Sequence, residues 1–182
     1  MKFIKTKIKD LYIIEPTVWK DERGYFYESY SQRAFEAEGI QVSFVQDNQS
    51  MSQKGTLRGL HAQTEPNAQG KLVRVIQGRV IDVAVDIRKD SESYGQHLAI
   101  ELSGENQRMF WVPAGFLHGF VTLEDHTIFT YKVTSAYNKS AEFGVLWNDP
   151  DLGIDWGIGE NEIILSEKDQ LLPSFKELVS PF

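Results

Sequence analysis

The stretch from Gly55 to Gly78, GTLRGLHAQTEPNAQGKLVRVIQG, indicates the fold of the whole chain. Two segments that mix apolar and polar residues flank a polar loop, a pattern typical of two β-strands joined by a connection. His61 and Gln63 are two residues apart, so a strand places both on one face. Lys71 opens the second strand and Gly78 ends it. The stretch therefore predicts a pair of strands whose polar face lines a pocket.

Further strand-like segments follow at roughly the 8–12-residue spacing of barrels and sandwiches. In Arg79 to Ile87 the apolar residues alternate with polar ones, and Asp82 and Asp86 share one face. This alternation predicts a strand with one solvated face. The other expected strands are Leu11–Ile14, Tyr25–Tyr30, Phe44–Ser50, Thr56–Gln63, His97–Leu102, Met109–Val112, Phe120–Leu123, Thr127–Val133 and Glu142–Trp147.

Helices are few. The clearest runs from Ser31 to Gly39, with a serine suited to the N-cap and a glycine suited to the C-terminal stop. The segment Ser166 to Asp169 resembles the start of a second, short helix. Many strands, few helices and regular turns predict an all-β fold of the jelly-roll barrel type, with a few short helices.

Length and composition limit the classes of protein that fit. The chain has 182 residues, 41% hydrophobic, which is enough for one globular domain spanning residues 1–182. A formal charge of −7 argues against nucleic acid as a partner. The absence of cysteine excludes disulfides and thiolate sites and fits a cytoplasmic protein. We expect no signal peptide and no membrane span, since no long apolar run is present.

The spacing of Gly55, His61, Gln63, Lys71 and Gly78 resembles the first motif of the cupin fold. The segment Pro113 to His118 resembles the second. Metal-binding cupins supply two histidines and a glutamate from the first motif, but glutamine and lysine stand at the later two positions here. A lysine ammonium repels a cation and has no free lone pair. The sequence therefore predicts no bound metal and no other cofactor.

The same residues fit proton transfer. A lysine beside His61 would disfavour the imidazolium and keep the ring a free base. The Lys71 ammonium would also stabilise negative charge on a substrate oxygen, as proton abstraction next to a carbonyl requires. Tyr131 fits a general acid or a core aromatic, and Asp169 fits a carboxylate that orients His61 or the helix start alone. A structural histidine and a solvated lysine remain the simpler alternatives.

Several residues fit the binding of a nucleoside diphosphate. The candidate diphosphate ligands are Arg23, Arg58 and Lys71, and the candidates for stacking on a base are Phe26 and Tyr137. Strict alternation would place Arg58 on the face opposite His61. A β-bulge at Gly59, between them, would bring both side chains to one face.

Taken in order along the chain, these segments are similar to the dTDP-4-dehydrorhamnose 3,5-epimerase family of cupin-fold enzymes. The matching stretches are DERGYFYESY (Asp21 to Tyr30), FVQDNQS (Phe44 to Ser50), KGTLRGLHAQ (Lys54 to Gln63), GKLVRVIQGRVIDVAVDIR (Gly70 to Arg88), WVPAGFLHGF (Trp111 to Phe120), YKVTSAY (Tyr131 to Tyr137) and LWNDPDLGIDW (Leu146 to Trp156). The resemblance implies an isomerase that converts dTDP-4-keto-6-deoxy-D-glucose to dTDP-4-keto-L-rhamnose, in dTDP-L-rhamnose biosynthesis.

The resemblance also implies roles for single residues. His61 matches the general base, Asp169 its partner, Tyr131 the general acid and Lys71 the residue that stabilises the enolate. The positions that match sugar and diphosphate contacts are Gln46, Asn48, Arg58 and His118. Those that match the segment reaching the neighbouring subunit's nucleotide are Arg23, Phe26 and Glu28, and Tyr137 matches an aromatic near the nucleobase. Family members are homodimers without metal or organic cofactor.

One departure from the family pattern is Ala62, where an aromatic residue usually follows the histidine. A strand directs it away from the His61 face, so we expect altered packing and unchanged chemistry. Two other functions fit the same residues: an epimerase that inverts only C3 or only C5, and a cupin that binds a nucleotide sugar without catalysis. A metal-dependent cupin oxygenase is a third alternative.

Overall fold

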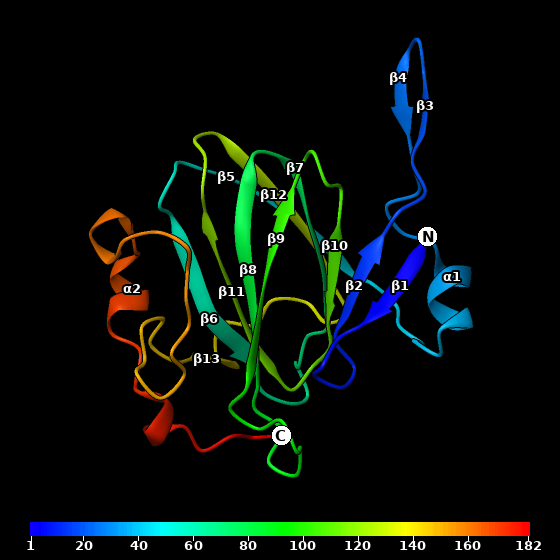
Figure 1. Ribbon diagram of the computed structural model, residues 1–182. Coiled ribbons are helices and arrows are strands. Elements are labelled where there is room, and N and C mark those ends of the chain that lie inside the picture. Colours follow the sequence, from blue (N-terminus) through cyan, green and yellow to red (C-terminus); the bar gives the residue numbers. More distant parts are fainter.

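The computed structural model describes residues 1–182 and contains two antiparallel sheets packed face to face, as the predicted jelly-roll barrel requires (Figure 1). The strands of the first sheet, in spatial order, are β1 (Lys2–Lys5), β2 (Tyr12–Glu15), β10 (Met109–Val112), β7 (Lys71–Gln77), β12 (Thr127–Val133) and β5 (Gln46–Ser52). Those of the second are β13 (Glu142–Gly144), β6 (Leu57–Gln63), β11 (Phe116–Thr122), β8 (Arg79–Asp86) and β9 (His97–Ser103).

The core between the sheets is built from the inner faces of these strands. Phe110, Phe129 and Val75 come from the six-stranded sheet and pack against Val80 and Phe120 of the five-stranded sheet. The rings of Phe120 and Phe129 stack with centroids 4.0 Å apart across the barrel. This apolar layer fills one part of the interior and leaves the pocket at its edge.

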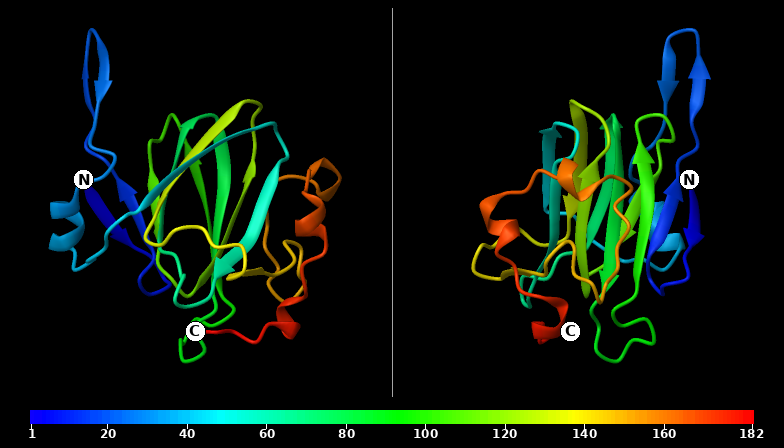
Figure 2. Two further views of the ribbon diagram at one scale, coloured as in Figure 1. Left: turned by 180° about the vertical axis from the view of Figure 1, so that it is seen from behind. Right: turned by 60° about the vertical axis from the view of Figure 1, so that its left-hand side comes forward.

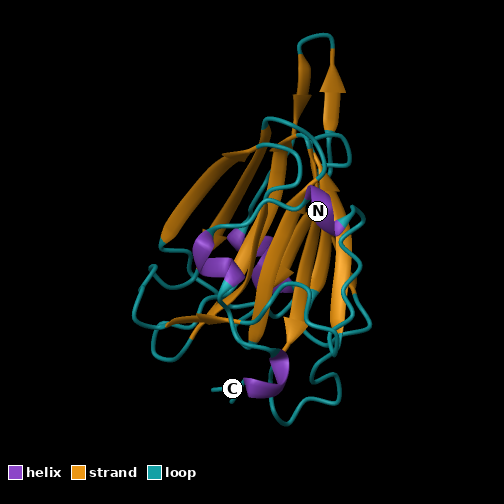
Figure 3. Ribbon diagram, turned by 90° about the vertical axis from the view of Figure 1, so that its left-hand side faces the viewer, coloured by secondary structure: helices purple, strands orange, loops and turns teal.

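The five-stranded sheet is buried on both faces. Its outer face, including Leu60 and Val83, packs against Trp147 and Trp156 of the C-terminal segment. That segment contains the short helices η1 (Glu160–Glu162), α2 (Glu167–Gln170) and η2 (Phe175–Glu177), and it runs alongside β6 (Figure 2). Figure 3 shows that strands make up most of the molecule and that the helical turns are few and short. No helix is long and apolar enough to cross a membrane.

The predicted first helix is confirmed as α1 (Gln32–Ala37), with Ser31 at the N-cap. Gly39 ends the helical segment at a φ of +80°, a conformation that favours glycine. Phe35 is the buried residue of the helix, and its ring meets Trp111 edge-on at 5.9 Å. The helix thus covers the outer face of the six-stranded sheet.

A hairpin of β3 (Trp19–Asp21) and β4 (Gly24–Phe26) extends away from the barrel (Figure 1). The expected strand from Tyr25 to Tyr30 is shorter than predicted, because β4 ends at Phe26. Beyond it, the Tyr27 hydroxyl accepts a hydrogen bond from Arg74 of β7, which ties the base of the hairpin to the sheet. The tip has no such attachment, and Phe26 is 67% exposed.

Two predictions about strands were wrong. The face of β8 that carries Asp82 and Asp86 is not solvated, since both carboxylates are fully buried inside the barrel. The strand expected from Phe120 begins at Phe116, so His118 lies within β11 and not in a loop. Asp82 is paired with His118 inside the barrel, and Asp86 accepts hydrogen bonds from Arg88 and Ser93 of the loop that follows β8.

Candidate active site

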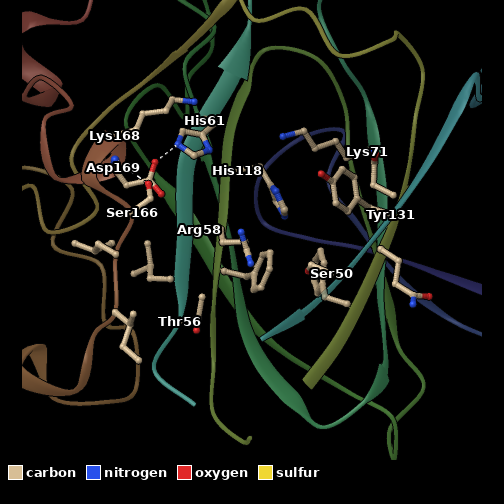
Figure 4. Close-up of a pocket in the computed structure, with 17 residues that line it drawn as sticks. Ser50, Thr56, Arg58, His61, Lys71, His118, Tyr131, Ser166, Lys168 and Asp169 are labelled. Carbon is tan, nitrogen blue, oxygen red and sulfur yellow. Dashed lines mark hydrogen bonds and ion pairs between the residues drawn. The ribbon is translucent and has the colours of Figure 1, made fainter. Parts of the chain in front are cut away.

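A pocket of about 520 Å³ opens between the two sheets (Figure 4). This volume suits a small organic ligand. The pocket residues from the five-stranded sheet include Arg58, His61, His118 and Phe120, and those from the six-stranded sheet include Asn48, Ser50, Lys71, Phe129 and Tyr131. Ser166, Lys168 and Asp169 close one side from the C-terminal segment. Both sheets and the C-terminal segment therefore contribute polar side chains to the pocket.

A β-bulge in β6 brings Arg58 and His61 to the same face. His61 pairs with His118 of β11, but Arg58 pairs with Phe120, so two residues of β6 stand opposite Gly119 alone. A Cβ on Gly59 would lie 2.5 Å from the Gly119 Cα, so both positions require glycine for the strands to approach this closely. The predicted bulge is confirmed, and Arg58 lines the pocket with His61.

His61 and Asp169 form the central pair of the site. The imidazole Nε2 lies 2.6 Å from Asp169 Oδ1, although the residues are 108 positions apart in the chain. The N-cap residue Ser166 accepts a hydrogen bond from the Asp169 amide, so the first turn of α2 fixes the position of the carboxylate. Burial raises the pKa of Asp169, but hydrogen bonds from His61 and Ser166 outweigh it and hold the pKa below its ordinary value. The ionised carboxylate orients the ring and leaves Nδ1 as the free lone pair.

A second carboxylate, which the sequence did not reveal, lies near the same ring. Glu142 Oε1 of β13 is 3.9 Å from His61 Nδ1. Its other oxygen is 2.5 Å from Lys168 Nζ and accepts a hydrogen bond from the Tyr137 hydroxyl at 2.9 Å. The carboxylates of Asp169 and Glu142 thus lie on the two nitrogen sides of the His61 ring.

Lys71 and Tyr131 occupy the opposite wall of the pocket (Figure 4). They lie on the neighbouring strands β7 and β12, where Tyr131 pairs with Val73. Burial lowers the pKa of Lys71 to about 8, against the opposing effect of Asp82 and Glu142. Burial also raises the pKa of the Tyr131 phenol, so it remains protonated at neutral pH. An ammonium and a neutral phenol thus stand beside each other, facing the His61 wall.

His118 has a partner of its own. Its Nε2 lies 2.9 Å and 3.1 Å from the two carboxylate oxygens of Asp82, on the adjacent strand β8. Burial raises the pKa of Asp82, although His118 and Lys71 act to lower it. The ring of His118 therefore lines the pocket and binds a side chain of the neighbouring strand.

Other expected site residues lie at the rim or away from the pocket. Gln46 donates a hydrogen bond to Asn48 at 2.7 Å and accepts one from the Tyr137 amide at 3.1 Å, which links the three at one edge. Gln63 does not face the pocket space, because its amide bonds the backbone oxygens of Asn67 and Ala136. The hairpin residues Arg23, Phe26 and Glu28 are exposed and do not line the pocket of their own chain.

The outward direction expected for Ala62 is confirmed. It packs with the cluster on the outer face of the five-stranded sheet, near Phe143. The small side chain therefore lies beneath the C-terminal segment, while His61 faces the pocket. No group of three or more histidine, aspartate or glutamate side chains is arranged to hold a metal ion.

A jelly-roll barrel with a histidine–aspartate pair, an ammonium and a phenol around one pocket defines a proton-transfer enzyme of the cupin type. A family model described as dTDP-4-dehydrorhamnose 3,5-epimerase matches residues 5–177. The chain belongs to this family, whose members are isomerases.

Individual relatives agree with this assignment. The dTDP-4-dehydrorhamnose 3,5-epimerase of Salmonella typhimurium is 53% identical over 174 residues, covering 95% of this chain and 94% of the relative. The crystal structure of the enzyme from Elizabethkingia anophelis is 55% identical with a TM-score of 0.93, and 97% of each chain is covered. The dTDP-6-deoxy-D-glucose-3,5-epimerase from Legionella pneumophila, in complex with dTDP-4-keto-L-rhamnose, is 49% identical with a TM-score of 0.93, covering 97% of this chain and 94% of that one.

Proposed function

We propose that this chain converts dTDP-4-keto-6-deoxy-D-glucose to dTDP-4-keto-L-rhamnose, with His61 as the base. The observation that carries the proposal is the 2.6 Å contact of His61 with Asp169 at the wall of the pocket, opposite Lys71 and Tyr131. The Legionella relative holds dTDP-4-keto-L-rhamnose, which would be the product here. The 4-keto group of the substrate acidifies the protons at C3 and C5, which are the bonds that a base must break.

Inversion of a carbon requires a base on one face and an acid on the other. His61 stands on the five-stranded sheet and Tyr131 on the six-stranded sheet, so a sugar ring between the sheets has one on each side. Nδ1 of His61 takes the proton while Asp169 stabilises the imidazolium through Nε2. Tyr131 then donates its phenolic proton to the opposite face of the carbanion, which inverts the centre.

The negative charge that develops on the 4-keto oxygen needs a donor. Lys71 lies on the same wall as Tyr131 and carries its proton at neutral pH, because its pKa is about 8. An ammonium in a largely buried pocket stabilises an oxyanion more strongly than one in water. We assign Lys71 to the enolate oxygen, where removal of one such donor costs about 3–4 kcal/mol of transition-state stabilisation.

The diphosphate contacts are assigned to the other end of the pocket. Arg58 forms no ion pair with a carboxylate of the chain, and its guanidinium donates only to Ser52 Oγ, at 3.3 Å. An arginine free of carboxylates in a pocket is suited to a diphosphate. Asn48, Gln46 and His118 complete the contacts to sugar and phosphate, and Tyr137, 54% exposed at the rim, stacks on the nucleobase.

We also propose a homodimer in which the β3–β4 hairpin of each chain reaches the nucleotide of the other. The hairpin extends from the barrel with Trp19, Tyr25 and Phe26 all more than half exposed. A solitary two-stranded hairpin is only marginally stable in water, which favours a partner surface. Arg23 and Glu28 would contribute the polar contacts to the neighbouring subunit's ligand. Sedimentation at micromolar concentration should give about twice the chain mass.

Incubation of the enzyme with dTDP-4-keto-6-deoxy-D-glucose in heavy water tests the reaction. Label at both C3 and C5 supports double epimerisation, and label at one carbon supports the single-carbon alternative. Tight binding without any label would indicate a non-catalytic sugar-binding protein. Exchange that disappears after chelation would indicate the metal-dependent alternative.

A further inference from the structure

Two inversions in one pocket create a proton imbalance, and this inference rests on the function proposed above. After the first inversion His61 carries the proton taken from carbon, and Tyr131 has lost its own. The second inversion needs a neutral His61 and a protonated Tyr131. The extra proton must therefore leave the His61 ring between the two steps, and Asp169 already occupies Nε2.

Glu142 lies where such a proton would leave. Strand β13 pairs with β6, placing Gly144 opposite His61 and Glu142 opposite Gln63. A Cβ on Gly144 would lie 3.1 Å from His61 Cδ2 and 2.3 Å from the Leu60 oxygen, so the glycine permits this close pairing. The pairing brings Glu142 Oε1 within 3.9 Å of Nδ1, the nitrogen that receives the proton.

We propose that Glu142 takes the proton from Nδ1 of His61 between the two inversions and releases it to solvent. In this step the Nδ1–H bond breaks and an Oε1–H bond forms, so both groups become neutral. Loss of the proton to water then restores the carboxylate, and the Tyr131 phenolate regains its proton from solvent. The 3.9 Å separation exceeds a hydrogen bond, but the imidazolium attracts the carboxylate, and such contacts tighten during turnover.

The contacts of Glu142 suit a group that carries a proton from His61 to solvent. Lys168 of α2 and the Tyr137 hydroxyl hold Oε2, which leaves Oε1 directed at His61 of β6. Burial raises the pKa of Glu142, but Lys168, Tyr137 and His61 outweigh it, so the pKa lies below its ordinary value. Glu142 therefore rests as the carboxylate, the form that can accept a proton. The Lys168 side chain is 53% exposed, which places bulk water beside the network.

The test is single-turnover label uptake in heavy water with the Glu142→Gln variant, which keeps the shape of the side chain and cannot accept a proton. We expect the first carbon to gain label within about threefold of the wild-type rate, because His61 starts neutral. Label at the second carbon should be delayed at least tenfold, and a singly labelled sugar should accumulate. Raising the buffer concentration should shorten the delay, because buffer can accept the proton instead.

The matched control is Glu162→Gln, which removes a carboxylate paired with Lys54 at 2.8 Å in another part of the chain. It should leave both label rates unchanged. Parallel slowing at both carbons, no slowing, or a delay that ignores buffer would overturn the proposal. Absence of label in the wild type would instead overturn the proposed reaction. If Glu142→Gln does not fold, Glu142→Asp carries the same test, since it withdraws the carboxylate by one methylene.

Discussion

His61 and His118 stand directly opposite each other on β6 and β11, and each bonds a carboxylate through Nε2. The carboxylates differ in origin. Asp169 reaches His61 from the C-terminal segment, whereas Asp82 reaches His118 from the neighbouring strand, fully buried. The pKa of Asp169 lies below its ordinary value and that of Asp82 above it, the latter through burial. The same two types of side chain thus form the proposed base pair at His61 and hold the His118 ring in a fixed position in the pocket lining.

The variant Asp169→Asn tests whether the negative charge of the Asp169 side chain, and not only its size, is needed at His61. The amide retains the size of the side chain but no longer stabilises the imidazolium. We expect kcat to fall by about 10²- to 10⁴-fold, because His61 without its carboxylate partner no longer works as a general base. Steady-state kinetics with the nucleotide sugar would measure it. Asp151→Asn removes an exposed carboxylate that pairs with Lys176 at 3.3 Å, and it should leave kcat unchanged.

His118→Ala should reduce stability more than His61→Ala. Removal of the imidazole leaves Asp82 buried without its hydrogen-bond partner, which costs about 3–5 kcal/mol. Asp169 loses less, because Ser166 and Lys168 remain beside it. Urea unfolding at pH 7 compares the two variants, and Asp82→Asn added to His118→Ala should recover part of the loss. Equal destabilisation by the two histidine variants would contradict this account of Asp82.

Gly59→Ala should disrupt the bulge that presents Arg58. The new Cβ would meet the Gly119 Cα at 2.5 Å, and the backbone φ of +140° is unsuited to alanine. We expect a loss of several kcal/mol, beyond the roughly 1–3 kcal/mol of an unfavourable backbone conformation alone, together with a raised KM. Gly39→Ala is the control, since its φ is +80° but nothing lies within 4 Å of the added Cβ. Thermal unfolding that ranks the two variants equally would show that the close approach is unimportant.

Much of the architecture follows from patterns that the sequence displays. Alternating apolar residues predicted β8, the cap at Ser31 and the stop at Gly39 predicted α1, and the start at Ser166 predicted α2. The bulge at Gly59 was also predictable, because only a glycine between Arg58 and His61 allows both to face one side. The pairing of His61 with Asp169 came from family resemblance, since 108 positions separate them.

The sequence did not show which polar residues are buried in the fold or which groups they contact. Asp82 and Asp86 alternate with apolar neighbours as on a solvated strand. Nothing in the local sequence shows that the fold buries both carboxylates beside hydrogen-bonding side chains. Gln63 shares a strand face with His61, yet its amide is bound to the backbone of two loops. Glu142 approaches His61 only because β13, three residues long, pairs with β6. Such contacts depend on how the strands and loops pair in the folded chain.

The pH dependence of the reaction should report Lys71. Burial lowers its pKa from the ordinary value of 10.5 to about 8. Below that pH the ammonium is present to stabilise the enolate, and as pH rises through about 8 the charge is lost. We therefore expect kcat to fall on the alkaline side with a midpoint near pH 8. The Tyr131 phenol does not account for this limb, because burial raises its pKa above 10.0.

Two variants and one stability measurement test the assignment to Lys71. Lys71→Met should lower kcat by about two to three orders of magnitude, as the loss of one oxyanion donor does, and the limb near pH 8 should vanish. Lys71→Arg keeps its charge at every pH, so whatever activity remains should no longer fall there. The unfolded chain keeps the lysine proton up to about pH 10.4, whereas the folded chain releases it from about pH 8. Between these values the unfolded state binds more protons, so this group makes the free energy of unfolding rise with pH. A limb near pH 8 that survives in Lys71→Met would assign it to another group and remove Lys71 from the enolate.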